Sequence, residues 1–136
     1  MTVQTRAAAA VEAGMELPPL EIPITATLIV AGALASRDFQ DVHHDAAVAK
    51  ASGAKDLFMN ILTTGGLVGR YVTDWTGPEA LVRKMSIRLG VPNYPGDTMT
   101  LTGRVTTVAG SDVIVEVRGA NALGDHVTGT VEVTLP

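Results

Sequence analysis

The chain has 136 residues, of which 46% are hydrophobic, and its formal net charge is −4. This length forms one domain, and the acidic balance excludes a nucleic-acid surface, which needs clustered Lys and Arg. The sequence contains no cysteine, which excludes a disulfide scaffold and fits a reducing, cytoplasmic compartment. No apolar run approaches the ~20 residues needed to cross a bilayer, so we expect no membrane segment.

The first predicted elements are a leader and a strand. Residues 1–19 are rich in Ala and end in two prolines that disfavour a continuing helix, so we expect a flexible leader there. The folded domain is expected over residues 20–136. From Ile22 to Val30 the even positions are apolar. This alternation predicts a strand with one buried face.

The polar loop that follows holds the residues most suited to chemistry. Asp38 and His43 lie five positions apart in this loop, just ahead of a helix. An acid and an imidazole on one short loop can hold a water molecule between them, which suits proton transfer. The alternative is structural: Asp38 caps a turn and His43 makes a buried polar contact, because motif matches this short are common by chance.

Two helices are predicted after the loop. A short one runs from Asp45 to Ser52 with Asp45 as its cap, and a longer one spans roughly Asn60 to Trp75. The longer helix has one stripe of apolar or small residues, formed by Ile61, Gly65, Val68, Val72 and Trp75. Glycines at 65, 66 and 69 each cost about 1 kcal/mol relative to alanine. We therefore expect another backbone to approach this helix closely.

The rest of the chain alternates apolar and polar residues with a period of two. Strands are predicted around residues 84–91, 98–106, 113–117 and 127–135, with turns at 109–112 and 121–125. The element order predicts an α+β protein with a single hotdog domain, an antiparallel five-stranded sheet wrapped around a long central helix. Because such a sheet has open edges, we expect it to pair with a second hotdog domain.

The loop resembles the hydratase motif of the MaoC-like, (R)-specific enoyl-CoA hydratases, which runs Ser-Gly-Asp-x-Asn-Pro-Leu-His-x-Asp. The residues that match this motif in register are Ser36, Asp38, His43 and Asp45, and those that depart from it are Arg37, Gln40 and Asp41. Two further stretches similar to the family are Ile61-Leu62-Thr63 and the segment from Pro92 to Asp97. The resemblance covers roughly residues 22–135.

This resemblance implies an enoyl-CoA hydratase, a hydro-lyase that needs no cofactor because the CoA thioester is its substrate. By position, Asp38 accepts a proton from water while His43 orients that water. In the family, the backbone N–H of a Gly that opens the central helix stabilises the thioester enolate. The matching position here is Asn60, with Ile61 next if the loop gap falls elsewhere.

Residues 36–45, 60–63 and 70–75 are similar to one branch of the family in particular. That branch comprises the small subunits of heteromeric hydratases in bacterial cholesterol side-chain degradation. The similarity implies a steroid enoyl-CoA substrate. It also implies a larger MaoC-like partner subunit, with which this chain would form a heterotetramer.

Other polar residues receive no role in proton transfer. Asp45 is expected to cap the short helix, and His44 to face substrate or solvent. No metal site is expected from His43, His44, Asp45 and His126, because paired-ligand helix spacing is missing. His126 opens the last strand and is expected to be exposed.

The residues that contact substrate stay unassigned. Arg37, Arg83, Lys84 and Arg88 suit CoA phosphates, and an ordinary solvated role suits them equally. Three alternative functions stay open: a homodimeric hydratase of short linear enoyl-CoA, a non-catalytic hotdog partner subunit and a hotdog thioesterase. The sequence argues against the thioesterase, because those enzymes usually place an acid on the central helix and Asp74 lies at its far end.

Overall fold

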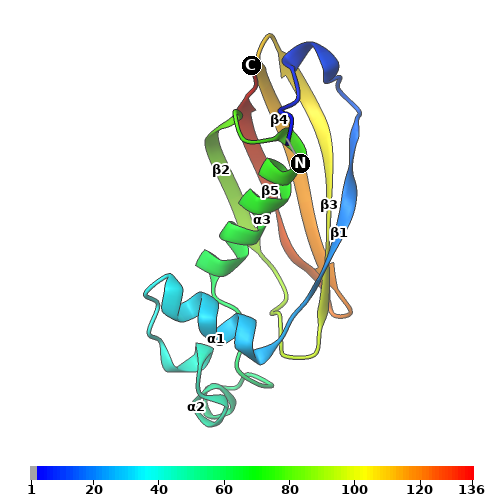
Figure 1. Cartoon of the computed structure of the whole chain (residues 1–136). Coiled ribbons are helices and arrows are strands. Elements are labelled where there is room, and N and C mark those ends of the chain that lie inside the picture. Colours follow the sequence, from blue (N-terminus) through cyan, green and yellow to red (C-terminus); the bar gives the residue numbers. More distant parts are fainter. Residues whose placement is uncertain (1–2) are drawn as a thin grey trace.

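The computed structural model describes residues 3–136 (Figure 1). Within these residues, five strands form one antiparallel sheet in the order β1-β3-β4-β5-β2. The strands are β1 (Glu16–Pro23), β2 (Leu81–Leu89), β3 (Thr98–Ala109), β4 (Asp112–Asn121) and β5 (Gly124–Thr134). The four predicted strands after the central helix are confirmed. Gly110 lies in the turn between β3 and β4, and Gly124 begins β5 directly after the next turn; their φ values of 61° and 133° suit glycine.

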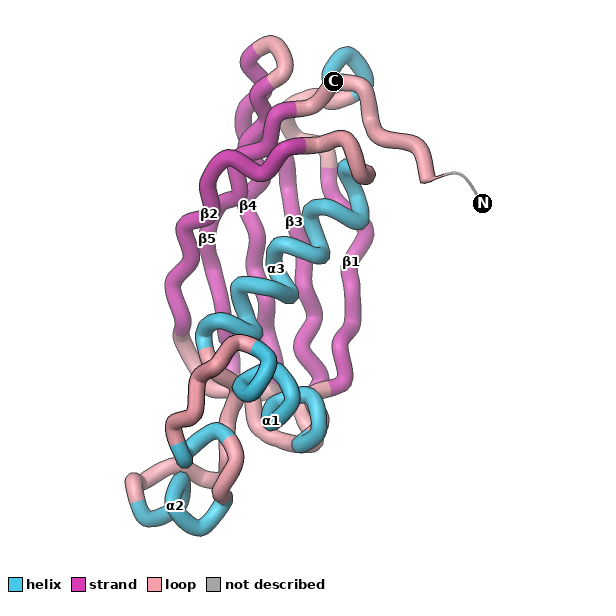
Figure 2. The backbone as a smooth tube through the Cα atoms, turned by 60° about the vertical axis from the view of Figure 1, so that its left-hand side comes forward, coloured by secondary structure: helices cyan, strands magenta, loops and turns pink. Residues whose placement is uncertain are grey.

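Helices and 3-10 turns complete the described fold. They are η1 (Ala8–Ala10), α1 (Ala26–Ala35), η2 (Asp41–His43), α2 (Ala46–Ala51) and α3 (Ile61–Thr76). The sheet curves around α3, while α1 and α2 gather near the N-terminal end of that helix (Figure 2). This is the predicted hotdog arrangement. Among residues 3–136, no helix combines the length and the apolar character that crossing a membrane requires.

The strand predicted from Ile22 to Val30 is wrong, because most of that segment forms α1. The side chain of Thr25 caps this helix by accepting a hydrogen bond from the Leu28 N–H at 3.0 Å. Helix α1 buries Ile29 and Ala33, which are four positions apart. A short apolar run fits both periodicities, so its alternation by itself did not identify a strand.

The first strand lies upstream of the predicted one, and it begins inside the segment expected to be a leader. Strand β1 contains Pro18 and Pro19, which cannot donate to a ladder of hydrogen bonds. The strand lies at an edge of the sheet, and its pairing with β3 shifts register between Leu17 and Leu20. The irregularity accommodates both prolines.

Residues upstream of β1 also contact the domain. Val11 is buried, and the Nε atom of Arg6 donates to the Trp75 carbonyl at 2.7 Å. The Arg6 guanidinium lies 4.7 Å from the centroid of the Trp75 ring. The first two residues of the expected leader, Met1 and Thr2, lie outside the described residues.

The core lies between α3 and the sheet. The residues that α3 buries are Thr64, Val68, Tyr71, Val72 and Thr76. The expected close backbone approach at its glycines is wrong, since side chains of β2 lie against Gly65 and Gly69, and Gly66 faces open space. A Cβ atom at Gly65 would lie 3.7 Å from Ile87 Cδ1, and one at Gly69 would lie 3.3 Å from Met85 Cε. Small residues therefore bring α3 close to the side chains of an edge strand.

Candidate active site

The C-terminal end of α1 presents Asp38. The N–H of Asp38 donates to the Ala33 carbonyl at 2.9 Å, and the N–H of Arg37 donates to the Leu34 carbonyl at 3.1 Å. This pair of bonds is a Schellman motif, which ends a helix with one residue in the left-handed conformation. Arg37 occupies that position with a φ of 58°. The backbone of Asp38 is thus fixed by the helix end rather than by a loose loop.

His43 ends η2 and is buried. Its Nδ1 atom lies 2.7 Å from the Phe58 carbonyl oxygen. Because a carbonyl can only accept, the hydrogen of the neutral ring belongs on Nδ1. The ring of Phe58 meets the imidazole edge-on, with the two centroids 5.1 Å apart. Neutral His43 therefore presents an unprotonated Nε2 atom on its other side.

The fold brings Asp38 and His43 together. The Nε2 atom of His43 lies 3.4 Å from Asp38 Oδ2, and the two side chains are 7% and 22% exposed, respectively. The side-chain amide of Asn60 is the main cause that lowers the pKa of Asp38. The Gln40 N–H and the charge of protonated His43 act in the same direction, and burial opposes them. A carboxylate and an imidazole nitrogen that both accept can be bridged by one water that donates a hydrogen to each.

Asn60 is the N-cap of α3 and is 2% exposed. Its Oδ1 atom accepts from the Thr63 N–H at 3.1 Å, while Nδ2 donates to Ser36 Oγ at 2.9 Å and to Asp38 Oδ2 at 3.0 Å. The backbone N–H groups of Asn60 and Ile61 meet no protein acceptor within residues 3–136. They lie at a helix N-terminus, where the helix dipole favours negative charge.

The side chain of Asn60 is a site feature that the sequence analysis missed. From the sequence, only a backbone N–H of this residue was expected to take part. An Asn directly before the first apolar turn of a helix was a signal for an N-cap. The contacts with Ser36 and Asp38, which are 24 and 22 residues upstream, depend on how α1 packs against α3, and α1 was not predicted from the sequence.

Large apolar side chains next to Asp38 and Asn60 in the chain are exposed. Phe39, Ile61 and Leu62 are 61%, 49% and 55% exposed. They come from the residue after Asp38 and from the first turn of α3. Apolar groups of this size gathered beside a polar pair are typical of a surface that a ligand or another chain covers.

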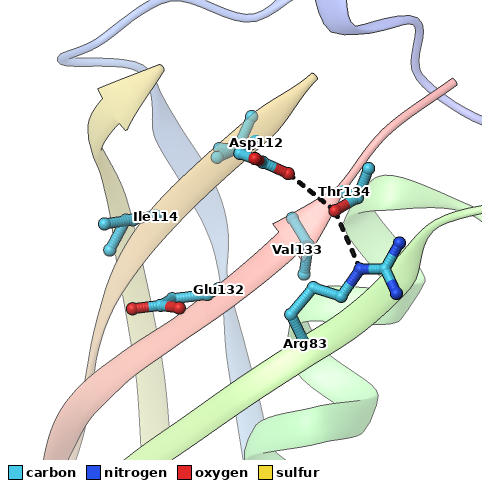
Figure 3. Close-up of a pocket in the computed structure, with 7 residues that line it drawn as sticks. Arg83, Asp112, Ile114, Glu132, Val133 and Thr134 are labelled. Atoms are coloured by element: carbon cyan, nitrogen blue, oxygen red, sulfur yellow. Dashed lines mark hydrogen bonds between the residues drawn. The ribbon is translucent and has the colours of Figure 1, made fainter. Parts of the chain in front are cut away.

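Of the basic residues considered for CoA, Arg37 directly precedes Asp38 in the chain, whereas Arg83, Lys84 and Arg88 belong to the edge strand β2. Arg83 lies in an open hollow of the sheet surface, where its Nε atom donates to Thr134 Oγ1 at 3.0 Å (Figure 3). The Thr134 hydroxyl donates in turn to Asp112 Oδ1 at 2.7 Å. Arg37, Lys84 and Arg88 are exposed. Their contact with CoA stays a prediction.

The expectation that His126 is exposed is wrong, since this residue is 1% exposed. Its Nδ1 atom lies 2.7 Å from the Val91 carbonyl oxygen, and its Nε2 atom lies 2.8 Å from Thr64 Oγ1. Burial lowers the pKa of His126, which keeps the ring neutral. The neutral ring joins β5 to α3 and to the segment after β2.

Asp45 and His44 lie beside the candidate pair along the chain. The prediction that Asp45 caps the short helix is confirmed, because its Oδ1 atom accepts from the Ala47 and Val48 N–H groups at 2.9 and 3.2 Å. His44 is exposed, and its Nε2 atom lies 3.5 Å from Asp41 Oδ1. Neither residue forms a hydrogen bond or an ion pair with Asp38 within residues 3–136.

Comparison with known families places this site in context. Residues 8–126 match the family described as "MaoC like domain". The chain belongs to this family. The resemblance of the loop to the MaoC-like hydratase motif is thereby confirmed at the level of the family. A relative from Mycobacterium tuberculosis (strain H37Rv), named 3-oxo-4,17-pregnadiene-20-carboxyl-CoA hydratase beta subunit, is 56% identical over 122 residues. The match covers 90% of this chain and 95% of that protein.

Solved structures agree with this MaoC-like assignment. A chain in the crystal structure of the ChsH1-ChsH2 complex from Mycobacterium tuberculosis has a TM-score of 0.91 and 54% identity, over 92% of this chain and 98% of that one. R-hydratase PhaJ1 from Pseudomonas aeruginosa has a TM-score of 0.89 and 24% identity, over 98% of this chain and 88% of that one. The second likeness concerns the fold alone, which confirms the hotdog architecture of the family.

Proposed function

We propose that this MaoC-like chain is the hydratase subunit that adds water across the 2,3 double bond of a steroid side-chain enoyl-CoA in cholesterol catabolism. The substrate class is supported by 56% identity to a chain named as the beta subunit of a pregnadiene-carboxyl-CoA hydratase. The observation that carries the mechanism is the approach of His43 Nε2 to Asp38 Oδ2 at 3.4 Å. Two acceptors at this distance are suited to holding one water by its two hydrogens.

In the proposed reaction, the oxygen of that water attacks the β-carbon of the unsaturated thioester. Asp38 accepts one hydrogen of the water as a proton, and His43 Nε2 holds the other and orients the lone pair. The electron pair of the double bond forms the new bond between the α-carbon and the carbonyl carbon, and the carbonyl π pair moves to the thioester oxygen. A proton then returns from the Asp38–His43 pair to the α-carbon, and the carbonyl forms again. One hydrogen of the water thus ends on the β-hydroxyl group, and the proton delivered to the α-carbon replaces the one that Asp38 accepted.

The enolate oxygen needs a donor that is already in place. We assign this role to the backbone N–H of Asn60, at the N-terminal end of α3. A fixed backbone N–H aided by the helix dipole stabilises the charge that develops in the transition state. The lowered pKa of Asp38 is compatible with the same mechanism, because the proposed base is the ionised carboxylate.

The active assembly is proposed to be a heterotetramer with a larger MaoC-like subunit. Two observations support a partner: the relative is named a beta subunit, and the similar solved chain comes from a complex. Exposed Phe39, Ile61 and Leu62 beside the pair give that partner an apolar surface on which to complete the acyl site. A cytoplasmic location is proposed with it, supported by the absence of cysteine.

The test is to purify the chain with any protein that accompanies it and to follow the loss of enoyl-thioester absorbance. A steroid enoyl-CoA and a four-carbon enoyl-CoA are compared at equal concentrations. We expect hydration of the steroid substrate by the complex and little by the isolated chain. Full steroid turnover by the isolated chain would exclude the partner requirement.

The same assay separates the two remaining candidates. Faster turnover of the four-carbon substrate by a homodimer would indicate a short-chain hydratase instead. Activity that survives replacement of both Asp38 and His43 would indicate that this chain is a non-catalytic partner subunit and that the chemistry belongs to the other chain.

A further inference from the structure

We infer that the side-chain amide of Asn60 is a positioning group that holds the Asp38 carboxylate in place for water activation. This inference rests on the proposed function and extends it to a side chain that transfers no proton. Nδ2 of Asn60 donates to Asp38 Oδ2 at 3.0 Å and to Ser36 Oγ at 2.9 Å. One amide thus contacts the end of α1 and the candidate base together.

The orientation of this amide is determined by its partners. The Thr63 N–H is a donor and lies 3.1 Å from Asn60 Oδ1, so the NH2 group must face the other way, toward the Asp38 carboxylate. Asn60 is 2% exposed, and a rotated amide would leave buried polar groups unpaired. The cap of α3 and the contact with Asp38 therefore require the same rotamer.

The amide acts on the oxygen that also faces the imidazole. Asp38 Oδ2 receives the Asn60 hydrogen bond and lies 3.4 Å from His43 Nε2, while Asp38 Oδ1 receives the Gln40 N–H at 3.4 Å. Both oxygens are thus restrained, and the carboxylate plane is fixed relative to the imidazole. The remaining lone pairs are left for a water molecule.

The charged surroundings of Asp38 are simple enough to make the effect of the amide measurable. The titratable group that faces Asp38 is His43, from η2. The C-cap of α1, Ser36, contributes an uncharged hydroxyl. Arg37 precedes it in the chain, is exposed, and makes no ion pair within the described residues. From α3 the group that reaches Asp38 is the neutral Asn60 amide.

The side chain and the backbone of Asn60 are assigned separate tasks. The N–H is proposed to meet the thioester oxygen, whereas the amide is directed to the carboxylate of Asp38. The substitution Asn60→Gly separates them, because glycine keeps the N–H and is well tolerated as an N-cap. It removes the amide alone.

The experiment measures the Asp38 pKa and the pH dependence of turnover for Asn60→Gly in the assembled complex. Carboxyl-carbon NMR titration of Asp38 is expected to give a pKa higher than in the parent, because a donor to the ionised form is lost. The acidic limb of the kcat/KM profile should move to higher pH in the same direction. We expect kcat to fall roughly tenfold or more, with a smaller change in KM, because the base is less well oriented.

The matched control is Thr25→Gly, which removes the side-chain cap of α1 far from Asp38 and should leave the Asp38 pKa and the acidic limb unchanged. If Asn60→Gly does not fold, Asn60→Ser keeps a preferred cap at the Thr63 N–H, and its shorter side chain lacks the NH2 group that reaches Asp38, so the same upward shift is expected. An unchanged Asp38 pKa, or an unchanged kcat and acidic limb, would overturn the inference. Full turnover by Asp38→Asn would instead contradict the proposed function, because Asp38 would then not act as the base. This result can be told apart from failure of the inference, since Asn60→Gly could still raise the Asp38 pKa.

Discussion

Gly32 of α1 packs directly against Thr63 of α3. A Cβ atom at Gly32 would lie 2.2 Å from Thr63 Oγ1 and 2.8 Å from its Cγ2. Thr63 Oγ1 is itself buried and makes no hydrogen bond within the described residues. This contact sets the separation between two helices whose adjoining ends hold Asp38 and Asn60. The geometry of the candidate site therefore depends on the absence of one side chain in α1.

We predict that Gly32→Ala destabilises the protein by about 1–3 kcal/mol, because an extra methyl group overpacks the contact between α1 and α3. Turnover should fall as well, since α1 must move and Asp38 moves with it. Urea unfolding and the hydration assay measure the two effects. The matched control is Gly66→Ala in α3, where the added Cβ meets no atom within 4 Å apart from its chain neighbours and the backbone of its own helix. This change should stabilise the protein by about 1 kcal/mol.

The companion change Thr63→Ala distinguishes a local clash from a general defect. It removes Oγ1 and Cγ2, the two atoms that the new methyl group would meet most closely. Oγ1 is also a buried hydroxyl oxygen without a hydrogen-bond partner in residues 3–136. Thr63→Ala alone should cost little, and added to Gly32→Ala it should restore most of the lost stability. Independent, additive losses in the double variant would contradict this contact as the cause.

Arg37→Gly should stabilise the protein by about 1 kcal/mol. The parent residue holds a φ of 58°, where side chains other than glycine are strained at the end of a helix. Thermal unfolding measures the gain. Arg37→Ala is the control, since it removes the charge and keeps the strained conformation, so no gain is expected. A loss of substrate affinity in both variants would show that the guanidinium contacts CoA.

Asp38→Asn and His43→Ala should each lower the hydration rate by on the order of a hundredfold or more in the intact complex, because each removes one of the two groups that hold the water. The rate of enoyl-thioester loss measures this. Asp41→Asn is the matched control, since Asp41 is exposed and pairs only with His44 among the described ion pairs. Near-normal rates in both test variants would exclude the pair from the mechanism.

The sequence predicted most of the fold because its later strands follow period two and its turns carry glycine where φ is positive. It failed at α1, where an apolar run from Ile22 to Val30 fits a strand as well as a helix. It also failed at His126, since a histidine at a strand start does not reveal that Thr64 and Val91 satisfy both its nitrogens. The approach of Asp38 to His43 could be predicted, because the two residues lie on the same short loop.

Burial of His126 makes stability depend on pH in a defined window. Its folded pKa lies below the ordinary value of 6.5, because burial penalises the charged ring. The unfolded chain then binds more protons than the folded one between the two pKa values, so stability rises with pH in this window. We therefore expect the free energy of unfolding to decrease as pH falls below about 6.5, until the folded pKa is reached.

His126→Gln should remove this pH dependence and cost about 1–3 kcal/mol at pH 7.5, because the Val91 carbonyl and the Thr64 hydroxyl lose well-placed partners. Urea unfolding at several pH values between 5 and 7.5 measures both effects. His44→Gln is the control, because His44 is exposed and its replacement should leave the slope in place. A parent protein whose stability is flat across this range, or an unchanged slope in His126→Gln, would contradict a neutral, buried ring. The Asp38 contribution falls in a separate window, since a depressed carboxyl pKa adds stability that is lost only at more acidic pH.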